Sequence, residues 1–126
     1  MIIYQKTFLI RAKPEDVFQA LTKPSFIKRW SGVKAEMDDK EGTMFKLWNG
    51  WCFGKNIKVE KNKYLIQEWD TLELDAPTEV SFILNEHKSG TELEVIQVGL
   101  PKKLFEQYSK GWEENYIKPI QRLFLK

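Results

Sequence analysis

The chain has 126 residues, carries 20 Lys and Arg against 18 Asp and Glu, and is 42% hydrophobic. This length predicts a single domain, 1–126, that buries roughly two-thirds of its surface without disulfides or metal. The near-even charge balance does not favour nucleic-acid binding, and every apolar run is far shorter than the ~20 residues of a membrane span. The lone cysteine, Cys52, cannot form an internal disulfide, and no secretory signal is visible at the N-terminus. We therefore expect a cytoplasmic protein.

Aromatic residues make up 13% of the chain, which is generous for so small a domain. Large rings bury roughly 150–250 Å² each, so these side chains either fill a core or line a hollow. The one histidine, His87, leaves no Cys/His set for zinc. We expect no metal, no cofactor and no catalytic residue of the nucleophile–histidine kind.

The N-terminal part of the chain predicts a strand and two short helices. Ile2–Arg11 is rich in β-branched and aromatic residues, as strands are. Pro14 then opens a helix that ends near Thr22, because proline is favoured in the first turn. Pro24 opens a second helix with Phe26, Ile27 and Trp30 on its apolar side, and Ser31-Gly32 ends it.

The middle of the chain predicts an antiparallel meander, because short alternating segments are separated by turn residues. Asn49-Gly50 is the strongest hairpin signal. The apolar pattern places Trp51, Phe53, Ile57 and Val59 on the inner face of their strand and Cys52 on the other. The expected strands are Val33–Met37, Thr43–Trp48, Trp51–Glu60, Tyr64–Asp70, Thr78–Glu86 and Thr91–Val98.

The last segment predicts a long amphipathic helix from about Lys102. Its apolar residues recur every four positions: Leu104, Tyr108, Trp112, Tyr116, Ile120 and Phe124. Gly111 and Pro119 disfavour a straight helix, so we expect a kink or break near 115–119. Strand, two helices, strands and long helix together predict an α+β fold in which an antiparallel sheet wraps the C-terminal helix.

The order of these segments resembles the helix-grip superfamily of START and Bet v 1-like domains. Within it, the chain is most similar to the activator of heat-shock protein 90 ATPase homologue family. In the second helix Ser31 stands where many relatives carry a second tryptophan. The matching segments are Ala12–Thr22, Phe26–Trp30, Gly42–Phe45, Gly54–Trp69, Gly90–Leu93 and Gly111-Trp112.

The resemblance implies two kinds of role. Eukaryotic members are two-domain co-chaperones whose C-terminal domain has this fold, which implies a heat-shock protein 90-type chaperone as a partner. Many bacterial members consist of this domain alone, and wider relatives bind lipids, polyketides or hormones in a cavity. The N-terminal domain that carries much of the chaperone contact is not in this sequence, so the co-chaperone role transfers less directly.

One set of mostly aromatic residues is expected to converge between the sheet and the last helix. These residues either line an apolar pocket or fill a core, and the fold resemblance favours the pocket. The expected lining residues are Trp30, Phe45, Trp51, Phe53, Trp69, Phe82, Gln97, Tyr108 and Trp112.

Polar residues in phase with inner faces are the remaining candidates. Gln97 should point inward and bond Tyr108, a trapped water or a ligand, and Gln67 raises the same question. Lys55 is nominally inward but is expected to reach solvent. Cys52 has no neighbour that would activate its thiol.

Three functions follow in order of preference. The first is a non-enzymatic binding domain with an apolar cavity for a hydrophobic small molecule or lipid. The second is a co-chaperone-like activator of heat-shock protein 90 ATPase. The third is a polyketide cyclase-like enzyme, for which only Gln97, Gln67 and Lys55 are available as inward polar groups.

Overall fold

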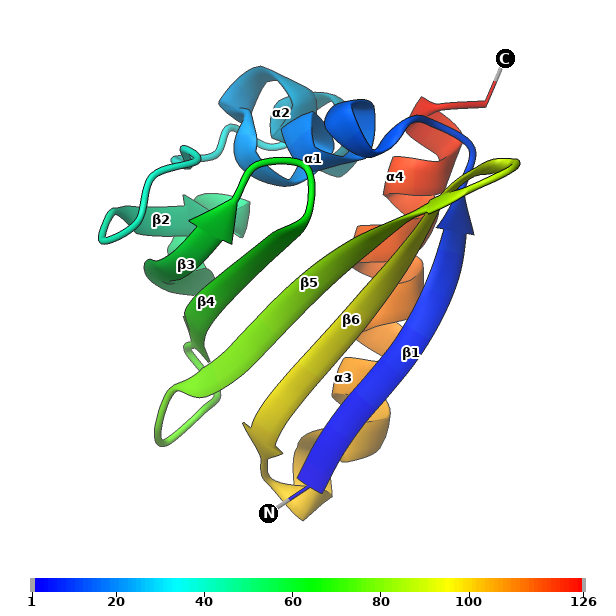
Figure 1. Ribbon diagram of the computed structural model, residues 1–126. Coiled ribbons are helices and arrows are strands. Elements are labelled where there is room, and N and C mark those ends of the chain that lie inside the picture. The colour runs from blue at the N-terminus through cyan, green and yellow to red at the C-terminus, as the bar shows by residue number, and fades with distance from the viewer. Residues whose placement is uncertain (1, 126) are drawn as a thin grey trace.

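The computed structural model describes residues 2–125, in which six strands form one antiparallel sheet in the order β1-β6-β5-β4-β3-β2 (Figure 1). Consecutive strands from β2 to β6 pair as hairpins, and β1 closes the sheet against β6, so the antiparallel meander is confirmed. The strands are β1 Ile2–Ile10, β2 Met44–Leu47, β3 Cys52–Glu60, β4 Tyr64–Thr71, β5 Thr78–His87 and β6 Gly90–Leu100.

The strand expected at Val33–Met37 does not form. Only Glu36 pairs, through two backbone hydrogen bonds with Lys46 of 2.9 and 3.0 Å. Ala35 and Met37 are nevertheless buried, so the segment packs over the sheet without extending it.

Two short helices follow β1 as expected: α1, Pro14–Thr22, and α2, Pro24–Ser31. Each begins at a proline, whose missing N–H is free of cost at the start of a helix. Gly32 ends α2 in the left-handed conformation, with φ of 80°.

The C-terminal helix is continuous but changes its hydrogen bonding along its length. A 3₁₀ turn at Lys102–Leu104 leads into α3, Phe105–Gly111, then into a π-helical segment, Trp112–Ile117, and finally into α4, Lys118–Leu123. The expected irregularity near 115–119 is therefore present as a π-helical stretch and not as a break. Pro119 stands in the first turn of α4, where its missing N–H is tolerated.

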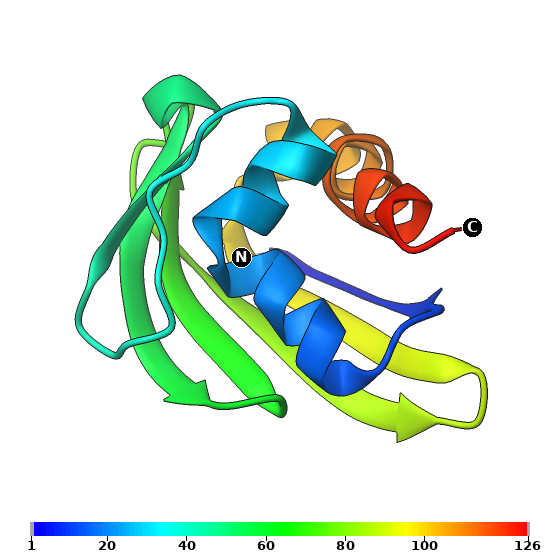
Figure 2. The same ribbon diagram turned by 90° about the horizontal axis from the view of Figure 1, so that it is seen from above.

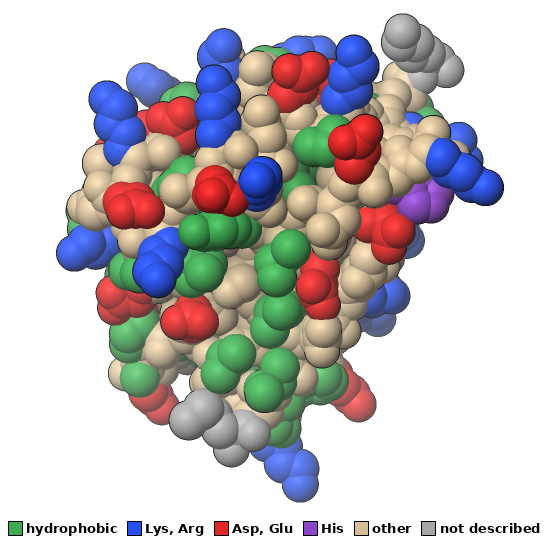
Figure 3. All heavy atoms as spheres, in the orientation of Figure 1, with side chains coloured by type: hydrophobic (Ala, Val, Ile, Leu, Met, Phe, Trp, Pro, Cys, Tyr) green, Lys and Arg blue, Asp and Glu red, His purple; other side chains and the backbone are tan. Residues whose placement is uncertain are grey.

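The sheet curves around the helices, which all lie on its concave side (Figure 2). α1 and α2 close one end, and α2 also packs against α4. The face turned toward the viewer in Figure 3 carries mixed acidic and basic side chains. The α+β fold with a sheet wrapped around the last helix is thus the observed architecture.

The first half of β3 presents the opposite inner face from the one expected, whereas Val59, beyond a register shift between Asn56 and Lys58, packs against the core as expected. Cys52, Gly54 and Asn56 are buried, whereas Phe53 pairs with Lys46 and Asp70 on the outer face. Directly opposed residues share a face in an antiparallel pair, so Phe53 cannot point at the helix.

The inner side of β3 accepts small residues because its space is already occupied. A methyl group on Gly54 would lie 3.1 Å from the Phe45 ring and 1.8 Å from the Glu68 carbonyl oxygen. Lys55 and Ile57 lie on the outside of the strand: Lys55 is exposed, and Ile57 is 41% exposed.

Candidate functional site

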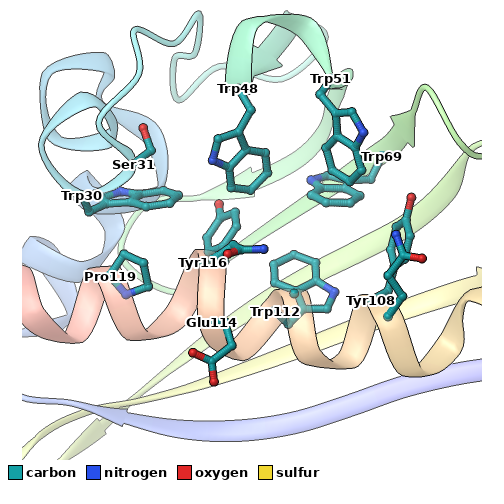
Figure 4. A pocket seen from close by; sticks show the side chains of 13 residues that line it. Trp30, Ser31, Trp48, Trp51, Trp69, Tyr108, Trp112, Glu114, Tyr116 and Pro119 are labelled. Carbon is teal, nitrogen blue, oxygen red and sulfur yellow. The ribbon is translucent and has the colours of Figure 1, made fainter.

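A pocket of about 460 Å³ lies between the C-terminal helix, the end of α2 and the turn that joins β2 to β3 (Figure 4). All five tryptophans of the chain line it, together with two tyrosines. Its remaining walls are small or polar. The lining residues are Trp30, Ser31, Trp48, Trp51, Trp69, Gln107, Tyr108, Gly111, Trp112, Glu114, Asn115, Tyr116 and Pro119.

The β2–β3 turn supplies the outer rings of this pocket. Trp48, Asn49 and Gly50 have φ angles of 49°, 58° and 86° in succession. This left-handed run is unusual, since a bulky residue such as tryptophan rarely adopts positive φ. It brings Trp48 and Trp51 over the space above the helix, where both side chains remain partly exposed (Figure 4).

Trp30 forms the wall at the α2 end. Its Nε1 donates a hydrogen bond of 2.8 Å to the carbonyl oxygen of Ala20, which fixes the ring. The ring centroid lies 4.7 Å from that of Tyr116 and 6.3 Å from that of Trp48. α1 and α2 thereby hold the helical end of the pocket in place.

The inner wall is a packed cluster of rings between the sheet and the helix. Trp112 stacks on Trp69 with centroids 5.1 Å apart and meets Phe82 edge-on at 5.7 Å. Tyr116 stacks on Phe82 at 5.5 Å. The aromatic residues therefore both fill the centre of the fold and surround a space: the centre is closed, and the pocket lies on its outer side.

A chain of hydrogen bonds supports the inner wall from behind. Trp112 Nε1 donates to Gln97 Oε1 at 2.8 Å, and Gln97 Nε2 donates to Thr78 Oγ1 at 3.0 Å. Thr78 Oγ1 in turn donates to the carbonyl oxygen of Trp69 at 2.8 Å. Gln97 thus links the helix to β4 and β5 and holds Trp69 and Trp112 together.

The second buried amide, Gln67, lies away from this chain. Its Nε2 donates to Asn56 Oδ1 at 2.9 Å. Asn56 Nδ2 donates to the carbonyl oxygen of Asp38 at 3.0 Å. This pair ties the segment before β2 to the sheet and does not line the pocket.

Tyr108 carries the main polar group at the other end of the pocket. Its hydroxyl lies 2.6 Å from Thr71 Oγ1 and donates to Glu73 Oε1 at 3.2 Å. Burial raises the pKa of Tyr108 to about 12. The hydrogen bond with Thr71 acts in the opposite direction and lowers this pKa, whereas the charge of Glu73 raises it. Burial likewise raises the pKa of Tyr116.

Three titratable side chains line the pocket: Tyr108, Glu114 and Tyr116. The hydrogen bond from Lys118, at 2.9 Å, lowers the pKa of Glu114. Tyr108 and Tyr116 shift the other way, to higher pKa. These shifts move all three groups away from neutral pH, where a general acid or base works best.

The structure brings five of the expected lining residues together: Trp30, Trp51, Trp69, Tyr108 and Trp112. Phe45 and Phe82 lie in the packed core, 1% and 0% exposed, and Gln97 lies behind the wall. The expectation for Phe53 is wrong, because β3 turns it to the outer face.

Two rings were missing from the expected set. Tyr116 follows Tyr108 and Trp112 at the same four-residue spacing, which was a usable signal. No signal in the sequence pointed to Trp48, because its position depends on the left-handed turn and not on the period of a strand or a helix.

The other candidate residues do not contribute to the pocket. Cys52 is buried on the inner face, and burial raises the pKa of its thiol, with a further contribution from Asp70. His87 accepts a hydrogen bond from the backbone N–H of Ser89 at 3.0 Å in the hairpin turn. Within residues 2–125, no cluster of His, Cys, Asp and Glu is suited to a metal ion. No helix in that range is long and apolar enough to cross a membrane.

A curved antiparallel sheet around a C-terminal helix, with two short helices at one end and a cleft beside the helix, defines a helix-grip domain. Residues 11–124 match the family described as Activator of Hsp90 ATPase homolog 1-like protein. The chain belongs to this family.

Two curated relatives are similar along nearly all of the chain. An uncharacterized protein of Schizosaccharomyces pombe is 24% identical over 121 residues, covering 94% of this chain and 36% of that protein. An activator of 90 kDa heat shock protein ATPase homolog of Dictyostelium discoideum is 22% identical over 117 residues, covering 90% and 30% respectively. The chain thus spans about a third of the length of the curated relatives it matches.

Solved structures have the same fold. PFC0360w, an HSP90 activator from Plasmodium falciparum, superposes with a TM-score of 0.90 at 22% identity, covering 98% of this chain and 96% of that one. CalU16 from Micromonospora echinospora superposes with a TM-score of 0.80 at 26% identity, covering 96% and 71%.

Proposed function

We propose that this chain is a non-enzymatic binding domain that holds a hydrophobic small molecule or lipid in the tryptophan-lined pocket. The observation that supports it is the convergence of all five tryptophans on one space of about 460 Å³. Ligand sites are typically apolar pockets of roughly 300–1,000 Å³ with a few polar groups.

The division of the aromatic cluster supports the same proposal. Trp69 and Trp112 are 3% exposed and already packed, so they give the pocket a fixed inner wall. Trp48 and Trp51 are partly exposed, so a ligand that covers them removes apolar surface from water. A preformed wall also lowers the ordering cost of binding.

Binding is tested by displacement of a fluorescent fatty acid and by mass spectrometry of gently purified protein. We expect saturable binding that Trp51→Ala weakens, roughly 5- to 100-fold, since interface tryptophans carry a large share of the contact energy. Ile57→Ala is the matched control, because Ile57 is an exposed apolar residue on the outer side of β3. Absence of binding by the unmodified chain, or equal loss in both variants, contradicts the proposal.

A co-chaperone-like role, as an activator of a heat-shock protein 90-type ATPase, is the second candidate. The similarity to two proteins described as Hsp90 activators favours it. We expect the chain to raise the ATPase rate of its cognate chaperone. A chaperone that shows neither binding nor stimulation at high concentration of this chain removes the candidate, whatever the pocket binds.

A further inference from the structure

We propose that the pocket takes a flat, neutral ligand carrying an oxygen acceptor, which receives a hydrogen bond from the Trp69 indole. This inference rests on the proposed binding function and narrows it to a chemical class. It starts from a polar atom that the fold leaves unpaired. Trp69 is 3% exposed and lines the pocket, and its Nε1 has no hydrogen-bond partner within the described residues.

The other tryptophans show how unusual this is. Trp30 Nε1 donates to Ala20 and Trp112 Nε1 donates to Gln97, both at 2.8 Å. Trp48 and Trp51 are partly exposed, so water reaches the edges of their rings. Buried N–H groups are nearly always paired in native proteins, so an unpaired one at a pocket wall indicates a partner that binds there.

The position of the unpaired group is suited to a ligand. The sheet holds the Trp69 backbone through Thr78, and Trp112 stacks on its ring, so the indole cannot turn toward an internal acceptor. Figure 4 shows Trp69 close to the lower end of Trp51 in this view, at the pocket wall, and its Nε1 is buried there. Because Nε1 is buried, an acceptor reaches it only when part of the wall moves, and we expect that part to be the turn with positive φ angles that carries Trp48.

Charge narrows the ligand class further. Among the described residues that line the pocket, none is Lys or Arg, so an anion there would lose its hydration without a countercharge. The positive end of the indole N–H dipole repels a cation at the same place, and the acidic lining residue Glu114 is already paired with Lys118 at 2.9 Å. A neutral carbonyl, ether or phenol oxygen fits both conditions, and ring-lined walls favour a flat molecule.

Four bicyclic compounds of one size test the inference: indane, 1-indanone, 1-aminoindane and indane-1-carboxylate. We expect 1-indanone to bind roughly three- to tenfold more tightly than indane, the range that one neutral hydrogen bond supplies. The charged amine and carboxylate should bind more weakly than indane. Proton–nitrogen correlation spectra should show the Trp69 indole proton moving downfield with 1-indanone and not with indane.

Two matched variants locate the effect. Trp69→Phe keeps an aromatic ring but removes the N–H, so it should abolish the preference for 1-indanone over indane. Trp51→Phe makes the same truncation at a partly exposed ring and should weaken both ligands in parallel. If Trp69→Phe fails to fold, two measurements on the unmodified chain still test the inference. These are the ratio of its affinities for 1-indanone and indane, and the shift of the Trp69 indole proton.

The outcomes separate the inference from the function on which it rests. Equal binding of indane and 1-indanone with an unmoved Trp69 resonance overturns the inference but leaves a binding pocket. Tightest binding by 1-aminoindane also overturns it and assigns a cation to the aromatic walls. Binding of none of the four compounds, together with no displacement of the fatty-acid probe, overturns both.

Discussion

Gln97 shows how a single buried amide can organise the wall of the pocket. It is 0% exposed, accepts from Trp112 and donates to Thr78. Its inward direction was predictable, because it is in phase with Leu93 and Val95 on one strand. Its partners were not predictable, since the expected acceptor or donor was Tyr108, a water or a ligand, and the structure uses an indole and a threonine.

Replacing Gln97 by leucine should therefore lower stability by about 1–3 kcal/mol, because the Trp112 N–H is then buried without an acceptor. Urea unfolding measures the change. Gln107→Leu is the matched control: its amide bonds only exposed Glu73 at 3.1 Å and should alter stability by less than about 0.5 kcal/mol. Equal effects of both substitutions would mean that the Gln97 network contributes nothing beyond packing.

Buried phenols make the folded state sensitive to alkaline pH. Burial raises the pKa of Tyr4 and Tyr108 from 10.0 to about 12. Below pH 10 both states keep these protons and stability is complete. As pH rises from 10 through 12, the unfolded chain releases protons that the folded protein retains, so stability is lost.

Urea unfolding at a series of alkaline pH values tests this linkage. Tyr108→Phe has one fewer phenol to ionise, so its stability should decline less steeply between pH 10 and 12 than that of the unmodified chain. The comparison uses the slope of stability against pH and not the stability itself, since the variant also loses the contact with Thr71. Parallel slopes would show that Tyr108 ionises alike in both states.

At the level of elements, the hydrogen bonding of the C-terminal helix explains why its apolar residues recur every four positions. A strict four-residue repeat drifts by about 40° per step around an α-helix of 3.6 residues per turn. Over Tyr108, Trp112, Tyr116 and Ile120 this would carry the apolar stripe about a third of the way around. The π-helical segment Trp112–Ile117 has wider turns, which counter the drift and keep these residues on the sheet side.

Only part of this was predictable from sequence. Gly111 and Pro119 indicated an irregularity in the right place. They did not indicate its form, because glycine and proline disfavour a regular helix without selecting between a kink, a break and a π turn. The four-residue period was the signal that favours the π form.

Replacing two glycines, each in a different element, by alanine should change the stability of the fold in opposite directions. Gly54→Ala should destabilise by about 2 kcal/mol or more, because the new methyl group meets the Glu68 backbone at 1.8 Å. Gly111 has helical angles of −61° and −41°, and its nearest obstacle is Asn115 Nδ2 at 3.8 Å. Gly111→Ala should therefore stabilise by about 0.5–1 kcal/mol.

Thermal and urea unfolding decide the signs of both changes. Because Gly111 lines the pocket, ligand titration of Gly111→Ala adds a second readout. A variant that is more stable but binds less would show that glycine keeps the pocket open. A destabilised Gly111→Ala, or a neutral Gly54→Ala, would contradict the contacts described for these positions.

For the whole molecule, the order of elements was predictable because each has a strong local signal, such as Pro14, Pro24 and Asn49-Gly50. Pairing of consecutive strands followed from the short turns between them. The pocket was less predictable, because it depends on sheet curvature and on the direction of the β2–β3 turn. The phase error in β3 has the same origin: Phe53 looked apolar enough to be inside, and the crowding around Gly54 is visible only in three dimensions.

The pocket takes its walls from α2, the β2–β3 turn, β4 and the C-terminal helix, so it should persist only while all of them are folded. We expect urea unfolding followed by tryptophan fluorescence and by far-ultraviolet circular dichroism to give one coincident transition. Fluorescence reports the pocket, since all five tryptophans line it, and circular dichroism reports the backbone. An earlier fluorescence transition would show that the pocket opens before the sheet unfolds.

The π-helical segment also means that the last helix holds about one residue more than a regular α-helix would need to present the same residues to the sheet. Deleting one residue between 112 and 117 would let ordinary α-helical bonding run through, and Tyr108 and Ile120 would then be separated by about 1,100°, close to three full turns. Ile120 would then stay on the sheet side. Comparison of this chain with its relatives along the helix must therefore allow a one-residue gap here, or the residues assigned to each face will be wrong.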